Sequence, residues 1–203
     1  MGELAGNSSG FGLLDGEASP PKFGRSNNGD IAAIELAYSA QDAINNWNLH
    51  TSYWLKHYLY LRCERPGFLK PLVGHKLYAT LVTRLTAAFW HGFYPGYFFF
   101  FGFSVLGSYA EDVCRRRVGP WFLKPTAPLH GYKPVYTLIG VVHTFVQVNY
   151  YGLAFVQLSL EKTLATWNTC YWCVHVLHVA LVLLVPLVVP RHKDKEEAAK
   201  KTE

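Results

Sequence analysis

The feature that most constrains the fold is an apolar run from residue 77 to residue 110, which contains the stretch LTAAFWHGFYPGYFFFFGF. A single helix over this run would be about 50 Å long at 1.5 Å per residue. That is too long for one ordinary crossing of a hydrocarbon core about 30 Å thick, and too short for two. Gly92, Pro95 and Gly96 interrupt the run. The sequence therefore predicts two shorter helices that meet within or near a bilayer.

Two later segments, residues 136–160 and 166–189, are long and apolar enough to cross a membrane. The sequence EKTLA at residues 161–165 is the predicted turn between them. Half of all residues are hydrophobic and 16% are charged, below the roughly 25% typical of soluble proteins. The chain is therefore predicted to be all-α, a multi-pass membrane helical bundle.

Residues 30–63 predict amphipathic helices rather than a crossing. Asp30 can cap a helix that begins at Ile31, and aromatic and aliphatic residues recur at helical spacing after Trp47. Lysine, histidine and arginine side chains interrupt the apolar face of this segment. We expect these helices to lie at the membrane interface or against other helices.

The two ends of the chain differ from the apolar part between them. Residues 1–29 are rich in glycine, serine and asparagine and include Pro20 and Pro21, which predicts a flexible loop or disorder. They contain no apolar segment of a signal peptide. Residues 191–203 form a charged tail. The predicted membrane domain is therefore residues 30–190.

The net charge of +5 predicts an anionic partner, and the basic residues flank the apolar runs. A membrane surface is therefore expected and nucleic acid is not, because no arginine-rich arm or RNA-binding signature is present. Lysine and arginine in residues 111–134 and in the tail predict that both are cytosolic. The tail ends in KKTE, which resembles the dilysine retrieval signal of endoplasmic reticulum membrane proteins. The predicted location is the endoplasmic reticulum membrane.

A CxxC pair, Cys170 and Cys173, lies near His175 and His178, and such spacing can mark a redox or zinc site. All four residues are in one apolar run that is predicted to be a single helix. Four ligands on one straight helix cannot surround a zinc ion tetrahedrally. We therefore predict no metal site.

Backbone groups that a helix break frees must be buried in protein or line a wet cavity, which predicts an internal cavity beside His91. Histidine suits general base chemistry, although a hydrogen bond to a neighbouring helix explains the residue equally well. Arg84 lies seven residues earlier on the same helical face. Its partner is either an acidic residue or the phosphate or carboxylate of a substrate. Asn48 by itself reads as a helix start.

Two motifs, taken together, resemble the membrane-bound O-acyltransferase family: WNLHTSYWLKHYLYLRC and AAFWHGFYPGY. They place His91 43 residues after Asn48. The pattern is most similar to the lysophospholipid acyltransferase branch, with its Trp-Asn-x-x-Thr segment and its later Trp-His-Gly-x-Tyr-Pro-Gly-Tyr. GDIAAIELAYSAQDAINNWN and NYYGLAFVQLSL also resemble the family. The resemblance covers roughly residues 28–190.

The resemblance implies a bundle of membrane helices that encloses a chamber, with acyl-CoA as co-substrate, a lysophospholipid as acceptor and no bound cofactor. His91 would be the catalytic residue and Asn48 its partner across the chamber. The function implied is acyl-CoA-dependent O-acyl transfer in phospholipid remodelling. The candidate substrate-binding residues are Trp47, Thr51, Trp90, Tyr94, Tyr97 and Arg84.

The chain departs from the family pattern in length, since family members are usually more than twice as long and have several spans before the Trp-Asn segment. It therefore resembles the C-terminal portion of the fold. One alternative is a truncated form or a catalytically inactive membrane subunit that assembles as a homo- or hetero-oligomer. Another is an acyltransferase for a sterol, diacylglycerol or protein acceptor. A transporter also contains broken helices, but no inverted repeat is visible here.

Overall fold

The computed structural model describes residues 8–15, 22–65 and 74–190. Its elements, in chain order, are β1 (Leu13–Asp15), β2 (Lys22–Phe23), α2 (Ile31–Glu35), α3 (Ala40–Asn46), α4 (Leu49–Leu55), the π-helical turn η1 (Lys56–Tyr60), α5 (Leu61–Cys63), α6 (His75–His91), α7 (Pro95–Arg117), α8 (Pro120–Leu123), the 3₁₀ turn η2 (His130–Tyr132), α9 (Lys133–Gln157), α10 (Leu160–Thr169) and α11 (Cys173–Val188). The all-α prediction is confirmed.

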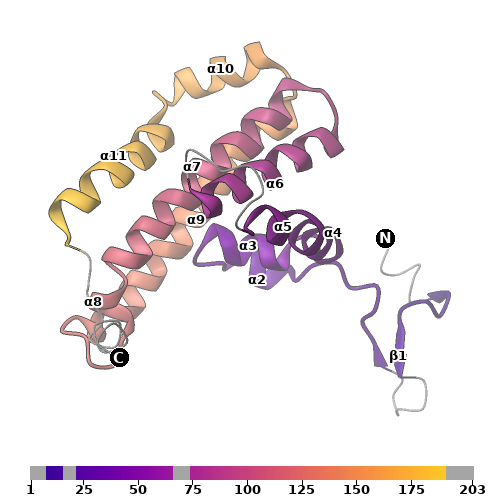
Figure 1. Ribbon diagram of the computed structural model, residues 1–203, viewed down its shortest axis with the longest axis horizontal. Helices are drawn as coiled ribbons and strands as arrows, with labels where there is room; N and C mark the ends of the chain where they lie inside the picture. The colour runs from indigo at the N-terminus through magenta and orange to yellow at the C-terminus, as the bar shows by residue number, and fades with distance from the viewer. Residues whose placement is uncertain (1–7, 16–21, 66–73, 191–203) are drawn as a thin grey trace.

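Helix α7 is the centre of the bundle. It packs most extensively against α6, α9 and α11. Figure 1 shows α6, α7 and α9 running side by side, with α2 to α5 on one side of them and α10 and α11 on the other. The short helices α3 and α5 and the turn η1 contact the long helices, so the segment between α2 and α5 packs on the bundle.

Two short segments near the N-terminus pair as an antiparallel hairpin, with Leu13 opposite Phe23. Residues 1–29 were predicted to be loop or disorder, and the structure corrects this for β1 and β2. A glycine-rich composition predicts turns, but it does not exclude hydrogen bonds between the backbones of two short segments such as β1 and β2, since every backbone N–H and C=O group needs a partner. The Gly24 N–H, for example, donates to the Gly12 carbonyl oxygen over 3.0 Å. Figure 1 shows the hairpin set apart from the helices.

The predicted break between two helices is confirmed. Helix α6 ends at a C-cap residue, Gly92, with φ of 131°, which side chains rarely allow. Pro95 occupies the first turn of α7, where its missing N–H costs nothing. At Gly96 a Cβ atom would overlap the Ala154 carbonyl oxygen, and the Gly96 N–H donates to the Leu158 carbonyl over 3.1 Å. Glycine thus lets α7 start directly against the end of α9.

Helix α7 extends further than predicted. Residues 111–134 were expected to be a polar loop, but α7 continues to Arg117 and the rest contains α8 and η2. Asp112 forms ion pairs with Arg115 at 2.6 Å and Arg116 at 2.8 Å, three and four residues later. Such pairs support a helix, and cations in the last turn suit its dipole.

One stretch within the described residues, His130–Gln157, is long and apolar enough to cross a membrane. It contains α9 and agrees with the predicted crossing at residues 136–160. The EKTLA segment, residues 161–165, was predicted to be a turn but is helical in α10. The chain turns earlier, because Leu158 adopts φ of 61° and Ser159 caps α10 by accepting a hydrogen bond from the Lys162 N–H.

The segment predicted to cross at residues 166–189 is not one continuous helix. It is split between α10 and α11, which are bent by 74° and which qualify as a second crossing only when the bent pair is counted as one span. Tyr171 and Trp172 have φ of 51° and 53°, outside the helical region. The Trp172 indole N–H donates to the Asn168 side-chain oxygen and its backbone N–H to the Trp167 carbonyl, so the bend carries its own hydrogen bonds.

Segment α4–η1–α5 is continuous, and η1 is a single π-helical turn within it. Both η1 and α5 contact α6, and Cys63 at the end of α5 is buried. The predicted amphipathic helices are therefore present, with an extra residue inserted in the middle of the second one. The predicted cap of the first helix is also present, because the Asp30 carboxylate accepts from the Ala33 N–H.

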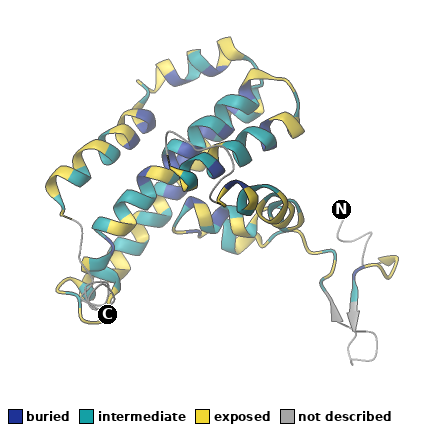
Figure 2. Cartoon of the chain, in the orientation of Figure 1, coloured by how far each residue is buried: buried dark blue, intermediate teal, exposed yellow. Residues whose placement is uncertain are grey.

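Two aromatic-rich clusters make the core. The larger cluster joins α7, α9, α10 and α11 and has as buried members Tyr150, Tyr151, Ala154, Trp167 and Val174. The smaller one, here called the Phe101 cluster, consists of buried Ala87, Ala88 and Phe101 with Leu55, Tyr97, Phe98, Phe100 and Phe155 packed against it. Figure 2 shows buried residues where the long helices meet and many exposed residues on α4, α10 and α11.

Candidate active site

His91 is the last residue of α6, and its ring lies among aromatic rings. The ring centroid is 4.9 Å from that of Phe155, 5.4 Å from Phe101 and 5.5 Å from Tyr97. Phe101 is a buried member of the Phe101 cluster, so one side of the imidazole packs against the core. The ring is nevertheless exposed in the described part of the chain. The internal cavity predicted beside His91 is therefore not closed by these residues.

Three further candidates gather at the same break. The Trp90 ring lies 4.8 Å from the His91 ring, and the Tyr94 and Tyr97 rings are 6.0 Å apart. Trp90 and Tyr94 are exposed, as is the neighbouring Phe93. The structure thus brings together one titratable group and a set of aromatic side chains that have open faces.

Asn48 lies in a separate turn between α3 and α4. Trp47 is extended and Asn48 is left-handed, with φ of 49°, a conformation that asparagine tolerates better than most residues. The Asn48 side-chain oxygen accepts a hydrogen bond from the side-chain NH₂ of Asn28 over 2.9 Å. Trp47 is exposed, and Thr51 follows in the first turn of α4. Three of the candidates therefore occupy one short segment.

The two groups of candidates belong to one region but do not touch. Among the described residues, no hydrogen bond joins Asn48 to His91. Leu55, at the other end of α4, packs on the Phe101 cluster against which the His91 ring lies. Asn48 precedes Leu55 by seven residues, which is two helical turns, or about 10 Å along the axis. Helix α4 therefore connects the asparagine turn to the wall behind the histidine.

Arg84 lies two turns before His91 on α6 and is partly buried. Within the described ranges, no carboxylate forms an ion pair with its guanidinium. The sequence left two partners open, an acidic residue or a substrate anion. The described part of the chain supplies no acidic partner.

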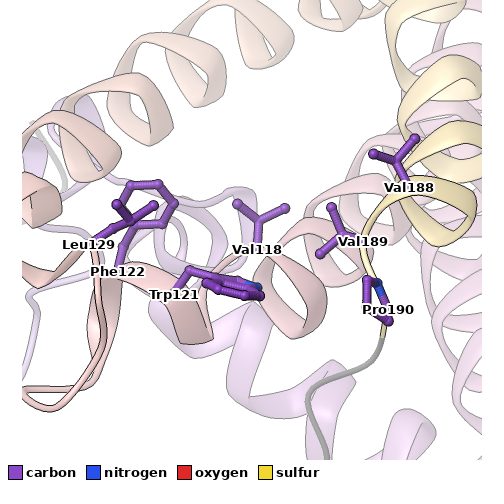
Figure 3. A pocket seen from close by; sticks show the side chains of 7 residues that line it. All are labelled: Val118, Trp121, Phe122, Leu129, Val188, Val189 and Pro190. Atoms are coloured by element: carbon purple, nitrogen blue, oxygen red, sulfur yellow. The ribbon is translucent and has the colours of Figure 1, made fainter.

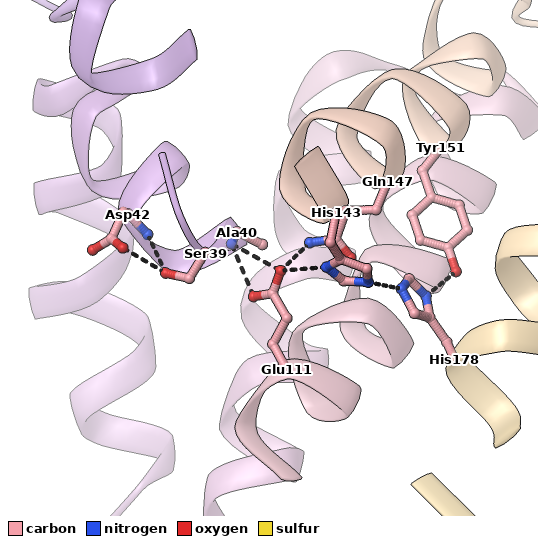
Figure 4. A network of polar contacts seen from close by, with 8 residues as sticks. All are labelled: Ser39, Ala40, Asp42, Glu111, His143, Gln147, Tyr151 and His178. Carbon is pink, nitrogen blue, oxygen red and sulfur yellow. Dashed lines mark hydrogen bonds and ion pairs between the residues drawn. The ribbon is translucent and has the colours of Figure 1, made fainter. Parts of the chain in front are cut away.

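A polar cluster that the sequence did not predict lies further along α7 and is centred on Glu111 (Figure 4). The Glu111 carboxylate accepts from the Ala40 N–H at the start of α3, at 2.8 and 3.1 Å, and from the Gln147 side-chain NH₂. It also lies 3.6 Å from His143, and its side chain is 15% exposed. Glu111 was assigned to a loop from its polar neighbours, so its burial could not be anticipated.

The cluster continues from α9 to α11. The His143 Nε2 atom lies 3.0 Å from His178 Nε2, and the Tyr151 hydroxyl lies 2.7 Å from His178 Nδ1 (Figure 4). His178 is fully buried. We call Glu111, His143, Gln147, Tyr151 and His178 the Glu111 cluster. It joins α3, α7, α9 and α11 through buried polar groups.

The cysteine pair does not lie on the single helix that was predicted, because Cys170 caps the end of α10 and Cys173 begins α11. Both thiols are free and exposed. His175 and His178 are buried and bond to tyrosine hydroxyls of α9. No group of three or more histidine, cysteine or acidic side chains in the described ranges could hold a metal ion.

A shallow apolar pocket of about 270 Å³ lies near the other end of α7 (Figure 3). Its lining residues come from the end of α7, from α8 and its following loop, and from the end of α11: Val118, Trp121, Phe122, Leu129, Val188, Val189 and Pro190. Helix α7 has 23 residues, which is about 35 Å, so this pocket is remote from His91. It contains no titratable group and is not a candidate active site.

Comparison with known proteins shows the family to which the chain is similar. The model of the membrane-bound O-acyltransferase family matches residues 7–153. The chain is 33% identical over 181 residues to the lysophospholipid acyltransferase of Schizosaccharomyces pombe, which covers 87% of this chain and 33% of that protein. It is 34% identical over 192 residues to lysophospholipid acyltransferase 2 of Arabidopsis thaliana, covering 92% and 39%.

A human relative is similar at the same level. The chain is 30% identical over 199 residues to membrane-bound glycerophospholipid O-acyltransferase 2 of Homo sapiens, covering 97% of this chain and 35% of that protein. The chain therefore spans between 33% and 39% of the length of these three relatives.

Proposed function

Because the chain belongs to the membrane-bound O-acyltransferase family, we propose that it carries the catalytic residues of an enzyme that transfers a fatty acyl group from acyl-CoA to a lysophospholipid. The membership confirms the resemblance that the two motifs indicated. The observation that carries the proposal is that the Asn48 and His91 segments pack against one aromatic cluster, through Leu55 and through the imidazole itself. The names of the relatives support a lysophospholipid as acceptor.

In the proposed reaction the acceptor hydroxyl attacks the thioester carbonyl. The new ester bond forms, the C–S bond breaks, and coenzyme A leaves. His91 takes the hydroxyl proton and returns a proton to the departing sulfur, a contribution of roughly 10²–10⁴-fold for a placed general base. Asn48 donates a hydrogen bond to the oxyanion that develops on the carbonyl, and such a donor is worth about 3–4 kcal/mol.

The remaining candidates have proposed roles in binding. Trp90 and Tyr97 lie against the imidazole, Tyr94 lies against Tyr97, and all three would contact the acceptor. Trp47 and Thr51 accompany Asn48 in the other segment. Arg84, which has no acidic partner in the described ranges, would bind a phosphate of either substrate. No bound cofactor is needed, because the thioester is already activated.

The proposed location is the endoplasmic reticulum membrane, with a multi-pass topology. Family membership and the apolar stretch His130–Gln157 support attachment to a membrane. The basic segment at residues 111–134 and the tail are proposed to be cytosolic. The tail and its KKTE ending lie outside the described residues. We retain residues 30–190 as the proposed membrane domain, although the family match begins earlier, at residue 7.

A second candidate is a catalytically inactive subunit that assembles with a full-length enzyme. The exposure of Trp90, His91, Phe93 and Tyr94 favours it, because the described residues leave one side of the site open. Transfer to a sterol, diacylglycerol or protein acceptor stays an alternative prediction for a member of this family, and no observation on the structure favours it.

The test is acyl transfer in microsomes from yeast that lacks its own lysophospholipid acyltransferases. The chain is expressed alone and also joined to the preceding part of the S. pombe relative. Transfer of labelled oleate from oleoyl-CoA to lysophosphatidylcholine is measured for each. We expect His91→Ala to lower transfer by roughly 10²–10⁴-fold, with the protein still present in the membrane.

The control is His57→Ala, which removes an exposed histidine of η1 whose ring lies 4.1 Å from that of Tyr53. Near-normal transfer by the His91→Ala variant would end the general base proposal. If neither form transfers oleate but the chain co-purifies with a full-length relative, the inactive subunit is the correct reading.

A further inference from the structure

We propose that Asn28 is a positioning residue that fixes the orientation of the Asn48 side-chain amide, so that its NH₂ group stays free to donate to the reacting oxygen. The proposal rests on the proposed function, in which Asn48 stabilises the oxyanion. Asn28 lies 20 residues before Asn48 in the segment that leads into α2, and it belongs to neither motif of the family resemblance.

Three hydrogen bonds join Asn28 to the Asn48 turn. Its side-chain NH₂ donates to the Asn48 side-chain oxygen over 2.9 Å. Its side-chain oxygen accepts from the His50 N–H over 3.1 Å, and its backbone carbonyl accepts from the Leu49 N–H over 2.9 Å. Both polar atoms of the Asn28 side chain and its backbone carbonyl oxygen thus form hydrogen bonds to the tripeptide at residues 48–50.

The backbone around Asn28 brings the two segments together independently of that side chain. Gly29 forms an antiparallel bridge with Trp47, and the Asp30 N–H donates to the Asn46 carbonyl over 3.1 Å. A Cβ atom on Gly29 would lie 3.2 Å from the Asn46 carbonyl oxygen, which is a tight contact. The position of Asn28 is therefore set by its neighbours, and its side chain is available to orient another group.

The chemistry of the amide group allows only one orientation of the Asn28 and Asn48 side chains in these hydrogen bonds. A carboxamide has an oxygen that only accepts and an NH₂ that only donates. The His50 N–H requires an acceptor, so the Asn28 oxygen must face His50 and its NH₂ must face Asn48. Asn48 then has to present its oxygen to Asn28. Its own NH₂ group is turned away, with no partner among the described residues.

A donor that is oriented before the reaction is what stabilises an oxyanion, because nothing has to rearrange when the charge appears. If the Asn48 amide turned over, it would present its oxygen to the developing negative charge, and the two would repel. Asn28 therefore prevents a reversal that the left-handed backbone of Asn48 cannot prevent by itself.

Substitution of Asn28 by aspartate separates orientation from local structure. Asn28→Asp keeps an oxygen that accepts from the His50 N–H, but it replaces the donor to Asn48 by a second acceptor. Asn48 would then turn its NH₂ towards the new carboxylate and away from the substrate. Asn28→Ala removes both side-chain bonds.

The experiment measures kcat and KM for oleoyl-CoA in the microsomal assay described above, using whichever form of the wild-type chain transfers oleate. We expect Asn28→Asp to lower kcat by at least about tenfold, with KM changed by less than about twofold and the amount of membrane protein unchanged. The Asn28→Asp, Asn48→Ala double variant should be no slower than Asn48→Ala alone, because both changes remove the same donor.

The matched control is Asn45→Asp, an exposed asparagine of α3 whose side-chain oxygen accepts a hydrogen bond from the Gln41 side-chain NH₂. It should retain the wild-type kcat. The proposal is overturned if Asn28→Asp has the wild-type kcat, or if its loss multiplies with that of Asn48→Ala in the double variant.

If neither form of the wild-type chain, alone or joined, transfers oleate, the proposed function is refuted and the Asn28 contacts are tested by themselves. Amide hydrogen exchange at His50, followed by mass spectrometry of the whole chain in detergent, does this. Exchange should be faster in Asn28→Ala and unchanged in Asn28→Asp. Equal exchange in all three chains would overturn the proposed contact.

Discussion

The two ends of α7 place polar groups in opposite situations. At its start, the break at Pro95 leaves His91, Trp90 and Tyr94 exposed, and the side chains there make ring contacts. At its other end, Glu111 is largely buried and bonds to α3 and α9. The buried polar groups around Glu111 have hydrogen-bond partners within the chain and hold the bundle together. The exposed side chains around His91 are instead available to a substrate or to another polypeptide segment.

The largest expected effect that would sharpen this comparison is at Asn48. Asn48→Ala should lower turnover by about 10²–10³-fold, because one donor to the oxyanion is lost. The amount of protein in the membrane should change little, since the side chain makes one hydrogen bond within the described residues, to exposed Asn28, and the other effect of alanine is on the left-handed backbone of this turn. Initial rates in the microsomal assay, normalised to immunoblots, measure both quantities.

Asn48→Gly is the control for the backbone, because glycine adopts the left-handed conformation freely. It should be as slow as Asn48→Ala. A fully active glycine variant would show that the asparagine serves the turn alone and that the open region contains no oxyanion donor at this position.

Glu111→Ala should give a smaller effect of a different kind. It leaves the Ala40 N–H and the Gln147 NH₂ without their acceptor, and an unsatisfied buried donor costs about 1–3 kcal/mol. We expect a lower unfolding temperature in detergent and less protein in the membrane, with turnover per folded molecule retained. Glu111→Gln, which keeps one acceptor oxygen, should be intermediate in stability.

The comparison would break if Glu111→Ala changed kcat per folded molecule as strongly as Asn48→Ala does. In that case the polar cluster would take part in the reaction, and the division between a structural end and a chemical end of α7 would be wrong.

The smallest effect is expected at the bend between α10 and α11, where the exposed Cys170 and Cys173 lie. Replacing both by serine should change the free energy of unfolding by less than about 0.5 kcal/mol and leave acyl transfer unchanged, as for other surface substitutions. Thermal unfolding in detergent and the oleate assay check this. A large loss of either property would indicate a thiol-dependent role that the exposed geometry does not predict.

Local signals predicted the part of the fold that local chemistry decides. Gly92 and Pro95 marked the break between α6 and α7, and Asp30 marked the start of α2. The bend at Tyr171 and Trp172 could not be predicted, because neither residue normally favours a positive φ, and the local hydrogen bonds of Trp172 to Trp167 and Asn168 leave no recognisable turn motif in the sequence. The burial of Glu111 within the extended α7 could not be predicted either, because its hydrogen-bond partners are 36 and 71 residues away.

The same distinction applies to the site. His91 and Asn48 were identified by motifs, and their catalytic roles stay a prediction. Asn28 was missed because it lies in a Gly- and Asn-rich stretch that reads as a turn, and its importance appears only when the fold brings it to Asn48. The spacing of the motifs also could not show that His91 is exposed within the part of the chain that the structure describes.

The π-helical turn η1 has a consequence for anyone who transplants the segment Leu49–Cys63 into another chain. Each residue of a helix advances the direction of the next side chain by about 100°, so the one inserted residue rotates everything after Tyr60 by that amount. A graft shortened by one residue to make a regular helix would turn buried Cys63 away from α6 while leaving Asn48 where it was. The irregular turn has to travel with the motif.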